Sequence, residues 1–320
     1  MPLAEKTLIA QIRRRARHGK NLVAGIGDDC AVLRLPAGHE ALLTTDFSLE
    51  GIHFRREWHP AEVVGHRCLT RGLSDIAAMG GEPIAAFLSL ALPRDLPQVW
   101  VNGFVRGFLQ LARRVNIPLA GGDTAESPQG VLADIVVLGS VPKGKAILRS
   151  GARRGDRIFV TGELGGSSAA LERMIKRPKG KLNPRHFPRH FFPEARLEAG
   201  RILRERKLAT AMIDLSDGLS TDLAHICEES GVGAEILAEA LPAAMVGKPA
   251  GVVERRFVLH GGEDYELLFT APPRKRVPSR LGGVPVTEIG VITRSRKIIL
   301  RNKSGVGHPL LPRGWEHFSH

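Results

Sequence analysis

The chain has 320 residues, 43% of them hydrophobic, and this length favours two domains, each with its own core. Its 46 lysines and arginines outnumber 33 acidic residues, for a formal charge of +13, but only 5% of residues are aromatic, which argues against a base-stacking surface. The three cysteines have no CxxC spacing, which excludes a disulfide scaffold and predicts a cytoplasmic protein. The longest apolar run has 11 residues, which is too short for a membrane segment.

In the first half of the chain, apolar periodicity predicts helices at residues 3–17, 61–79 and 99–114. Strands are expected at 31–35, 41–46, 85–92 and 133–141, with another that ends in AGGDT. A polar, glycine-rich segment at 142–156 follows. We therefore expect an amino-terminal domain over residues 1–142 and a carboxyl-terminal domain over residues 143–320.

In the second half, RIFVTG predicts a strand, GELGG a turn, and SSAALERMIKR a helix capped by Ser167 or Ser168. Residues 177–189 are expected to form a basic, proline-rich loop. Helices are predicted at 193–206 and 219–230, the second ended by Gly231, and strands at 256–260, 266–270, 287–292 and 297–301.

The positive charge is confined to two stretches. Residues 171–209 contain 12 basic and 4 acidic residues, a net of +8, and residues 271–303 contain 9 and 1, again +8. The remainder therefore carries 13 − 16 = −3. Neither stretch has the helix-turn-helix or zinc spacing of a nucleic-acid-binding motif, so we interpret both as solvated faces that could attract a small polyanion, with no nucleic-acid partner.

Six short turns place acidic residues next to glycine or hydroxyl residues: GIGDDC, TTD, LSD, GGDT, DLSDG and GGEDYE. One such turn is ordinary turn chemistry. Six of them, in a chain whose basic residues lie elsewhere, favour a site where carboxylates converge around Mg²⁺, which prefers oxygen ligands. The reaction class that fits such a site is phosphoryl transfer.

Other chemistries are poorly supported. Residues 139–146 match the P-loop pattern except at the last position, where Ala146 cannot provide the magnesium-binding hydroxyl. There is no GxSxG motif, no HExxH motif, and no basic residue beside Cys30 to activate its thiol.

Several motifs, in order and spacing, closely resemble the thiamine-monophosphate kinase family of the aminoimidazole ribonucleotide synthetase superfamily. They are GIGDDCAVL, TTDFSLEGIHF, LSDIAAMGGEPIAAFLSLALP, LAGGDT, LRSGARRGD, IDLSDGLSTDL, GGEDYELLFT and GWEHF. The resemblance runs from about residue 5 to residue 318. It implies transfer of the γ-phosphate of ATP directly onto thiamine monophosphate, giving thiamine diphosphate and ADP.

The resemblance also implies roles for individual residues, none of them a general acid or base, because the acceptor is already a phosphate oxyanion. Several Mg²⁺ ions would be held by Asp29, Thr44, Thr45, Asp46, Asp75, Asp123, Asp214 and Asp217, with Asp28 as a supporting neighbour. ATP would contact Gly122, Asp123, Arg149 and Ser216. Thiamine monophosphate would contact His53, Glu263 and Trp315, the last by stacking or through its π face.

The implied fold is α/β (α+β): an amino-terminal domain with a mixed sheet that pairs in a homodimer, and an α/β carboxyl-terminal domain. The sequence departs from the family at Val115, where an aromatic residue near the adenine is common. Two alternatives stay open at this point. One is an enzyme of the same superfamily that acts on another phosphorylated or carboxylated acceptor, and the other is a basic RNA-binding protein.

Overall fold

The computed structural model describes residues 1–17, 19–27, 29–177, 180 and 182–318. The chain divides into two compact units, the first formed by residues 1–76 and 81–144 and the second by residues 77–80 and 145–320. Among the described residues, no helix combines the length and apolar character that crossing a bilayer requires.

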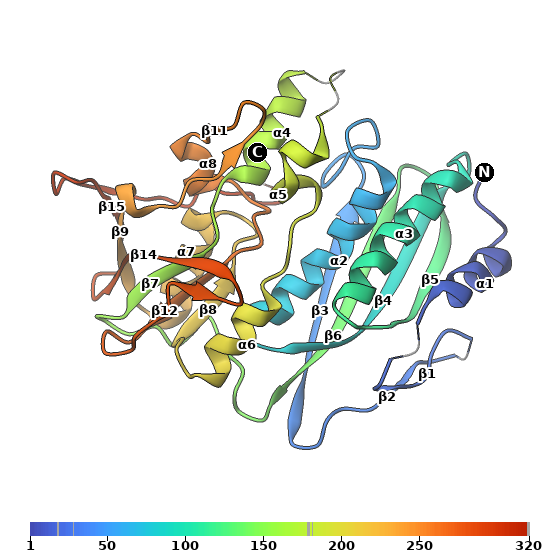
Figure 1. Ribbon diagram of the computed structural model, residues 1–320, viewed down its shortest axis with the longest axis horizontal. Coiled ribbons are helices and arrows are strands. Elements are labelled where there is room, and N and C mark those ends of the chain that lie inside the picture. Colours follow the sequence, from blue (N-terminus) through green and yellow to red (C-terminus); the bar gives the residue numbers. More distant parts are fainter. Residues whose placement is uncertain (18, 28, 178–179, 181, 319–320) are drawn as a thin grey trace. The chain divides into compact units, whose positions relative to one another are not determined.

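The first unit is a four-stranded mixed sheet covered on one face by two helices (Figure 1). The strand order is β3-β6-β4-β5, with β4 and β5 parallel and the other pairs antiparallel. The elements are α1 (Glu5–Arg15), β1 (Leu22–Ala24), β2 (Val32–Leu33), β3 (His39–Leu49), α2 (Ala61–Ala78), β4 (Glu82–Pro93), α3 (Gln98–Arg114), β5 (Leu119–Ser127) and β6 (Leu132–Pro142).

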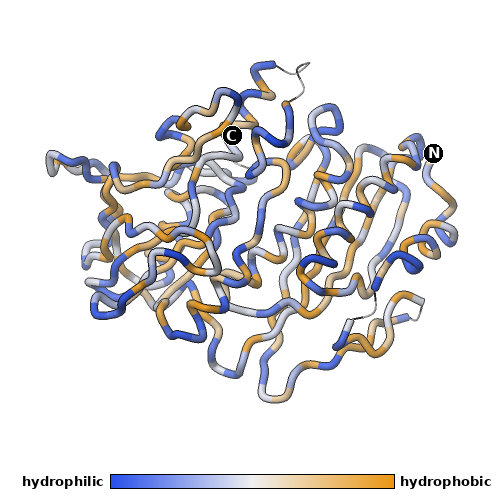
Figure 2. The backbone as a smooth tube through the Cα atoms, viewed as in Figure 1, coloured by the Kyte–Doolittle hydropathy of each residue, from blue (hydrophilic) through white to orange (hydrophobic). Residues whose placement is uncertain are grey.

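Alternation along β3 decides which residues face the helices. Leu42 and Ser48 are buried, whereas Leu43 is 72% and Phe47 55% exposed. Because successive side chains of a strand point to opposite faces, one face of β3 packs beneath the helices and the other carries exposed apolar side chains. Along α3, hydrophobic and hydrophilic residues alternate in the way that one buried helix face requires (Figure 2), whereas α2 is buried around nearly its whole circumference.

The second unit is built on an eight-stranded sheet of order β16-β15-β9-β14-β7-β12-β8, with β13 paired to β14. Its strands are β7 (Arg157–Thr161), β8 (Ala211–Asp214), β9 (Gly233–Leu237), β10 (Met245–Val246), β11 (Gly251–Val252), β12 (Leu267–Ala271), β13 (Arg280–Leu281), β14 (Val284–Thr293), β15 (Ile298–Arg301) and β16 (Gly307–Pro309). Strands β10 and β11 form a separate hairpin.

The helices of this unit are α4 (Gly166–Lys176), α5 (Pro188–Phe191), α6 (Leu197–Glu205), α7 (Leu219–Ser230) and α8 (Arg255–His260), with 3-10 turns η1 (Pro184–His186) and η2 (Ala238–Ala240). In the core, Phe159 of β7 stacks on Phe269 of β12 with ring centroids 5.3 Å apart, and Leu203 of α6 belongs to the same buried cluster. The predicted basic loop at 177–189 includes η1 and the start of α5 and lies partly outside the described residues.

Two local predictions are wrong. Residues 256–260, expected as a strand, lie in helix α8, because the short apolar run fits either structure and its packing against α7 and α4 buries one helical face. Helix α4 has no serine cap: its N-cap is Gly165, and the carboxylate of Asp264 accepts the N–H groups of Gly165 and Ser167 instead, at 2.6 and 3.4 Å.

Candidate functional site

Two of the predicted metal ligands on β3, Thr44 and Asp46, point toward helix α2. They lie on the same side of the strand as the buried Leu42 and Ser48. The Thr44 hydroxyl donates a hydrogen bond to Asp75 Oδ2, which lies in the last turn of α2. Asp46 is close enough to Cys68 of α2 for its charge to raise the pKa of that buried thiol. The structure therefore brings Thr44, Asp46 and Asp75 to one side of the sheet.

Thr45 lies on the opposite face of β3. Its hydroxyl donates to Asp134 Oδ1 on β6 at 2.7 Å. Alternation along the strand separates the Thr45 side chain from those of Thr44 and Asp46. Asp134 is a carboxylate that the sequence analysis did not single out.

Gly122 and Asp123 lie on β5 beside β4. In the ladder Gly122 pairs with Leu88 and Asp123 with Ser89. Gly122 has φ +148°, and a Cβ atom there would lie 1.9 Å from the carbonyl oxygen of Leu88, so this position requires glycine. Asp123 Oδ1 accepts the N–H of Thr124 at 2.8 Å, while the buried Thr124 hydroxyl has no hydrogen-bond partner among the described residues. An unpaired hydroxyl beside an exposed carboxylate is consistent with a polar ligand at this point of β5.

His53 follows the end of β3 in the turn closed by Glu50 and Phe54. The N–H of Leu49 donates to His53 Nδ1 at 3.0 Å, so Nδ1 carries no proton. The neutral ring then bears its proton on Nε2 and can donate it to an anionic oxygen.

Asp29 is exposed in the loop between β1 and β2, and its neighbour Asp28 lies outside the described residues. The hairpin packs through Leu22 and Leu33 onto a buried cluster that includes Ala120, two residues before Gly122.

Next to Asp29, Cys30 is exposed, whereas Cys68 and Cys227 are buried, and burial raises the pKa of both buried thiols to about 12.

In the second unit, the loop between β8 and α7 is the point on which separate segments converge. Asp214 ends β8 and is buried. The next three carbonyl groups each accept an N–H from elsewhere in the unit. Leu215 accepts from Tyr265 at 2.9 Å, Ser216 from Glu263 at 2.8 Å, and Asp217 from Trp315 at 3.0 Å. The structure thus places the predicted residues Asp214, Ser216, Asp217, Glu263 and Trp315 around one loop.

The segment from Glu263 to Glu266 is fixed by buried charges. Glu263 and Tyr265 have φ of +64° and +53°, which is uncommon for residues other than glycine. Burial raises the pKa of Asp264 to about 7, although its two N–H donors on α4 oppose the shift. The fully buried Glu266 accepts from Arg196 at 2.6 and 2.5 Å, from Arg189 at 3.0 Å and from the Thr161 hydroxyl at 2.7 Å.

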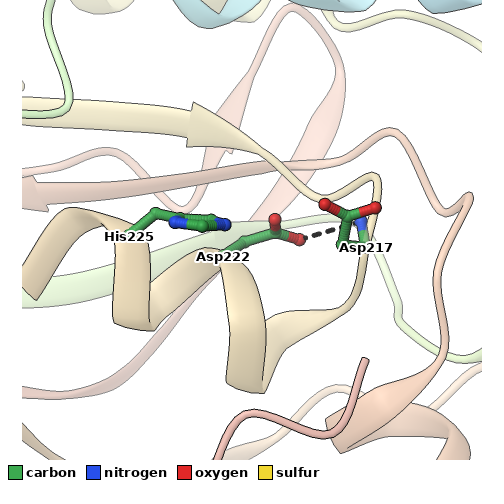
Figure 3. Close-up of side chains that lie close together, drawn as sticks. All are labelled: Asp217, Asp222 and His225. Atoms are coloured by element: carbon green, nitrogen blue, oxygen red, sulfur yellow. Dashed lines mark hydrogen bonds between the residues drawn. The ribbon is translucent and has the colours of Figure 1, made fainter. Parts of the chain in front are cut away.

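Asp217 also belongs to a cluster with Asp222 and His225 on the first two turns of α7 (Figure 3). One ligand atom from each lies within 4.8 Å of the others, and among the described residues this is the group of three or more that could hold a metal ion. Asp222 Oδ2 accepts the N–H groups of Gly218 at 2.9 Å and of Asp217 at 3.2 Å. Burial, together with the charges of Asp214 and Asp217, raises the pKa of Asp222 well above its ordinary value.

Arg149 is not part of this convergence. Its carbonyl accepts from the hydroxyl of Ser230, the last residue of α7, whereas Asp217 lies just before the first residue of that helix. Twelve residues of helix span about 18 Å, so Arg149 lies near the opposite end of α7 from the carboxylates. Its side chain is exposed.

The donor set fits magnesium better than a softer metal. Around Thr44, Asp46 and Asp75 in the first unit, and around Asp214 and Asp217 in the second, the available ligand atoms are carboxylate and hydroxyl oxygens. Hard oxygen ligands are those Mg²⁺ selects, and the partial exposure of Thr44, Asp46, Asp75 and Asp217 leaves room for water and phosphate oxygens. His225 is the one nitrogen ligand of the cluster in Figure 3.

Four acidic residues of these sites escaped the sequence analysis: Asp134, Asp222, Asp264 and Glu266. Asp222 had a detectable signal, since an acidic residue in the first turn of a helix is suited to N–H groups at that end. Asp264 and Glu266 lie inside the GGEDYE motif, but only the fold shows that they point inward. Nothing in the local sequence distinguishes Asp134 from any polar residue of a half-exposed strand.

The comparisons with known proteins first define a class. Two family models match the chain: AIR synthase related protein, N-terminal domain, over residues 27–141, and AIR synthase related protein, C-terminal domain, over residues 153–303. Both halves of the chain therefore have the fold of the AIR synthase related proteins, as expected from the motifs.

Within this class the relatives are more specific. Thiamine-monophosphate kinase of Escherichia coli (strain K12) is 37% identical over 329 residues, covering 100% of this chain and 99% of the relative. The crystal structure of thiamine-monophosphate kinase from Stenotrophomonas maltophilia K279a matches with a TM-score of 0.81 and 34% identity, covering 94% of this chain and 97% of the other. The structure of AaThiL complexed with AMPPCP and TMP matches with a TM-score of 0.77 and 33% identity over 99% of each chain. The chain belongs to the thiamine-monophosphate kinase family.

Proposed function

We propose that this protein transfers the terminal phosphoryl group of ATP directly to the phosphate of thiamine monophosphate, in a reaction that requires Mg²⁺ and yields thiamine diphosphate and ADP. The observation that carries the proposal is the convergence of Asp214, Ser216, Asp217, Glu263 and Trp315 on one loop. These residues come from three motifs that together span residues 214 to 315 of the sequence. Family membership supports the choice of substrates.

The carboxylates would hold the metal ions. In the first unit Asp46, Asp75 and Asp123 would contribute, with Thr44 orienting Asp75 through its hydrogen bond and Asp29 adding a charge from its loop. In the second unit Asp214 and Asp217 would contribute. Bound Mg²⁺ would neutralise the charge of the phosphate oxygens. Thr45 is the weakest member of the proposed set, since its side chain is bonded to Asp134 on the other face of the strand.

The residues proposed for thiamine monophosphate suit its two ends. The Nε2–H of neutral His53 can donate to a phosphate oxygen. Glu263 offers a negative charge and Trp315, 52% exposed, an aromatic face to the cationic ring system. No side chain is needed as a base, because the attacking oxygen of the acceptor already carries negative charge.

ATP would contact Gly122, Asp123, Arg149 and Ser216. Gly122 and Asp123 are both exposed on β5, and an arginine can pair with phosphate oxygens in a bidentate manner. We also propose a homodimer formed through the exposed apolar face of β3, and residence in the cytoplasm, in keeping with three free cysteines.

The test is an assay of ADP and thiamine diphosphate formation from ATP and thiamine monophosphate, with and without Mg²⁺. Activity is expected only when Mg²⁺ is present. Asp46→Asn and Asp217→Asn keep the side-chain size but remove the charge, and each should lower kcat by at least about a hundredfold, since even outer partners of a metal are worth 10- to 100-fold.

Asp95→Asn is the matched control, because Asp95 is an exposed aspartate outside these motifs, and its activity should equal that of the unaltered protein. Full activity of either site variant would refute the metal assignment. A panel of other phosphorylated and carboxylated acceptors tests the substrate, and faster turnover of one of them than of thiamine monophosphate would overturn the choice of acceptor.

A further inference from the structure

The first turn of α7 carries three consecutive polar side chains, Ser220, Thr221 and Asp222, and each accepts backbone N–H groups from outside the helix or from the turn before it. Asp222 takes those of Asp217 and Gly218, as described above. The other two side chains bind a different segment, near the carboxyl end of the described chain. Polar side chains at the start of a helix usually satisfy that helix's own N–H groups. Here Ser220 and Thr221 instead accept N–H groups of the segment at residues 313–314.

Thr221 holds the segment that carries Trp315. The N–H of Gly314 donates to Thr221 Oγ1 at 3.0 Å, and the next N–H, that of Trp315, donates to the carbonyl of Asp217 at 3.0 Å. The fit is close, because a Cβ atom on Gly314 would lie 2.2 Å from the Asp217 carbonyl oxygen and 2.6 Å from Thr221 Oγ1. The backbone at Gly314 therefore lies flat against the loop that bears Asp217.

Ser220 makes a second, weaker attachment. Its hydroxyl accepts the N–H of Arg313 at 3.3 Å and also pairs with Nδ1 of His260 at 2.8 Å. Burial and the neighbouring Arg313 charge lower the pKa of His260, which favours the neutral form of the ring. His260 ends α8, directly before the GGEDYE motif. One helix turn thus connects the segment of Trp315 with the segment of Glu263.

Trp315 itself has few other attachments in its described surroundings. Its ring is 52% exposed, and its ring contact is an edge-to-face one with His317, which is also exposed, at 5.6 Å between centroids. A side chain this exposed has no core to fix its position. The position of the indole therefore depends on the backbone bonds at Gly314 and Trp315.

We propose that Thr221 is a positioning residue for the thiamine end of the substrate: its hydroxyl holds Gly314, and through it Trp315, beside the loop of Asp217. This inference rests on the proposed function. It assigns Thr221 no contact with substrate. It requires that loss of the hydroxyl weaken the use of thiamine monophosphate and leave the use of ATP unchanged.

The experiment measures kcat and the KM of each substrate separately for Thr221→Val, Thr221→Ser, Trp315→Ala and the double variant Thr221→Val/Trp315→Ala. Loss of one hydrogen bond should raise the KM of thiamine monophosphate roughly three- to tenfold in Thr221→Val. The KM of ATP should not change. Thr221→Ser retains the acceptor oxygen and should restore the KM, and the double variant should be no worse than Trp315→Ala alone.

Thr293→Val is the control, because its hydroxyl bonds only within the loop after β14. Should Thr221→Val fail to fold, Gly314→Ala tests the same contact from the exposed segment without altering α7, and it should give the same KM increase. Four outcomes would each overturn the proposal. They are equal increases in the KM values of both substrates, failure of Thr221→Ser to restore the KM of thiamine monophosphate, additive losses in the double variant, and an unchanged KM of thiamine monophosphate in Gly314→Ala. Failure of the proposed function would be recognised differently, since the unaltered protein would then form no thiamine diphosphate.

Discussion

Asp264 shows how a residue can lie inside a recognisable motif and still have a role that the motif does not reveal. The sequence GGEDYE drew attention to Glu263. The structure places Asp264, one residue later, in the interior at the start of α4, where it accepts two N–H groups. Asp264 thus caps the start of α4, the role that was predicted for Ser167 or Ser168. A long-range cap of this kind joins residues about 100 positions apart and leaves no local pattern.

The raised pKa of Asp264 gives a pH-dependent contribution to stability. Its value is about 7 in the folded protein, against about 3.9 for an unfolded chain. Between these values the folded state binds more protons, so the free energy of unfolding should fall as pH rises from about 4 to about 7, by at most ~1.4 kcal/mol per pH unit. Urea unfolding of Asp264→Asn at several pH values should show this slope removed.

Asp95→Asn serves as the comparison, because Asp95 is exposed, and it should keep the slope of the unaltered protein. An Asp264→Asn profile that parallels the unaltered protein through the whole window would contradict the assignment.

Among individual residues, the motifs located most of the carboxylates that the structure gathers. Asp214 and Asp217 stand where an apolar strand meets a turn, whereas Asp46 lies inside β3, which continues to Leu49. The predicted strand at 41–46 already implies that Thr44 and Thr45 point to opposite faces. The sequence could not show which of the two faces the helices cover, because that is a tertiary property.

At the scale of secondary-structure elements, helices α2 and α3 pack closely against each other. A Cβ atom on Gly107 of α3 would lie 1.9 Å from the carbonyl oxygen of Glu62 on α2. Helices that approach this closely need a small residue at the crossing point. The sequence predicted α3 from its apolar face but gave no reason for a glycine in the middle of it.

Gly107→Ala should therefore destabilise the protein despite the better helix propensity of alanine. Overpacking of this kind costs typically 1–3 kcal/mol, and we expect a lower midpoint in thermal unfolding followed by circular dichroism. Gly251→Ala is the matched control, because a Cβ atom there would meet open space, and it should leave the midpoint unchanged. A stabilised Gly107→Ala protein would show that the two helices can separate without cost.

Elements with strong end signals were predicted best. Helix α7 runs from Leu219 to Ser230 as expected, because Gly231 takes the left-handed conformation that ends it. Strands β8 and β9 were missed: they have four and five residues, and each adjoins a predicted helix, α7, whose end signals are stronger. Helix α8 was taken for a strand because six residues are too few to show a period.

At the scale of the whole molecule, the distribution of charge is more informative than its sum. Within the second unit, Asp214 pairs with Leu267 at the start of β12, whereas the loop with Arg274, Lys275 and Arg276 follows Ala271 at its other end. Four steps of strand separate the two ends by about 13 Å. These three basic residues therefore lie away from the carboxylate loop of this unit.

The exposed apolar face of β3 leads to a prediction about assembly. Leu43 and Phe47 project from an edge strand of the first unit, and exposed apolar patches of this kind usually mark an interface. Phe47→Glu should convert the proposed homodimer into a monomer, because a two-fold interface repeats the new charge on both copies. Sedimentation velocity measures the change.

Val252→Glu provides the control, since Val252 is also highly exposed, at 68%, but lies in the separate β10–β11 hairpin. It should leave the sedimentation coefficient unchanged. A Phe47→Glu protein that still sediments as a dimer would place the interface elsewhere.

One cysteine is exposed and two are buried, so the unaltered protein can be labelled at a single thiol. Cys30 is accessible next to Asp29, while Cys68 and Cys227 are shielded and hold their protons more tightly than an ordinary thiol. A maleimide dye should therefore attach at a single position in the unaltered sequence. Its fluorescence would test, without engineered cysteines, whether metal and nucleotide bind at the β1–β2 loop, as proposed for Asp29.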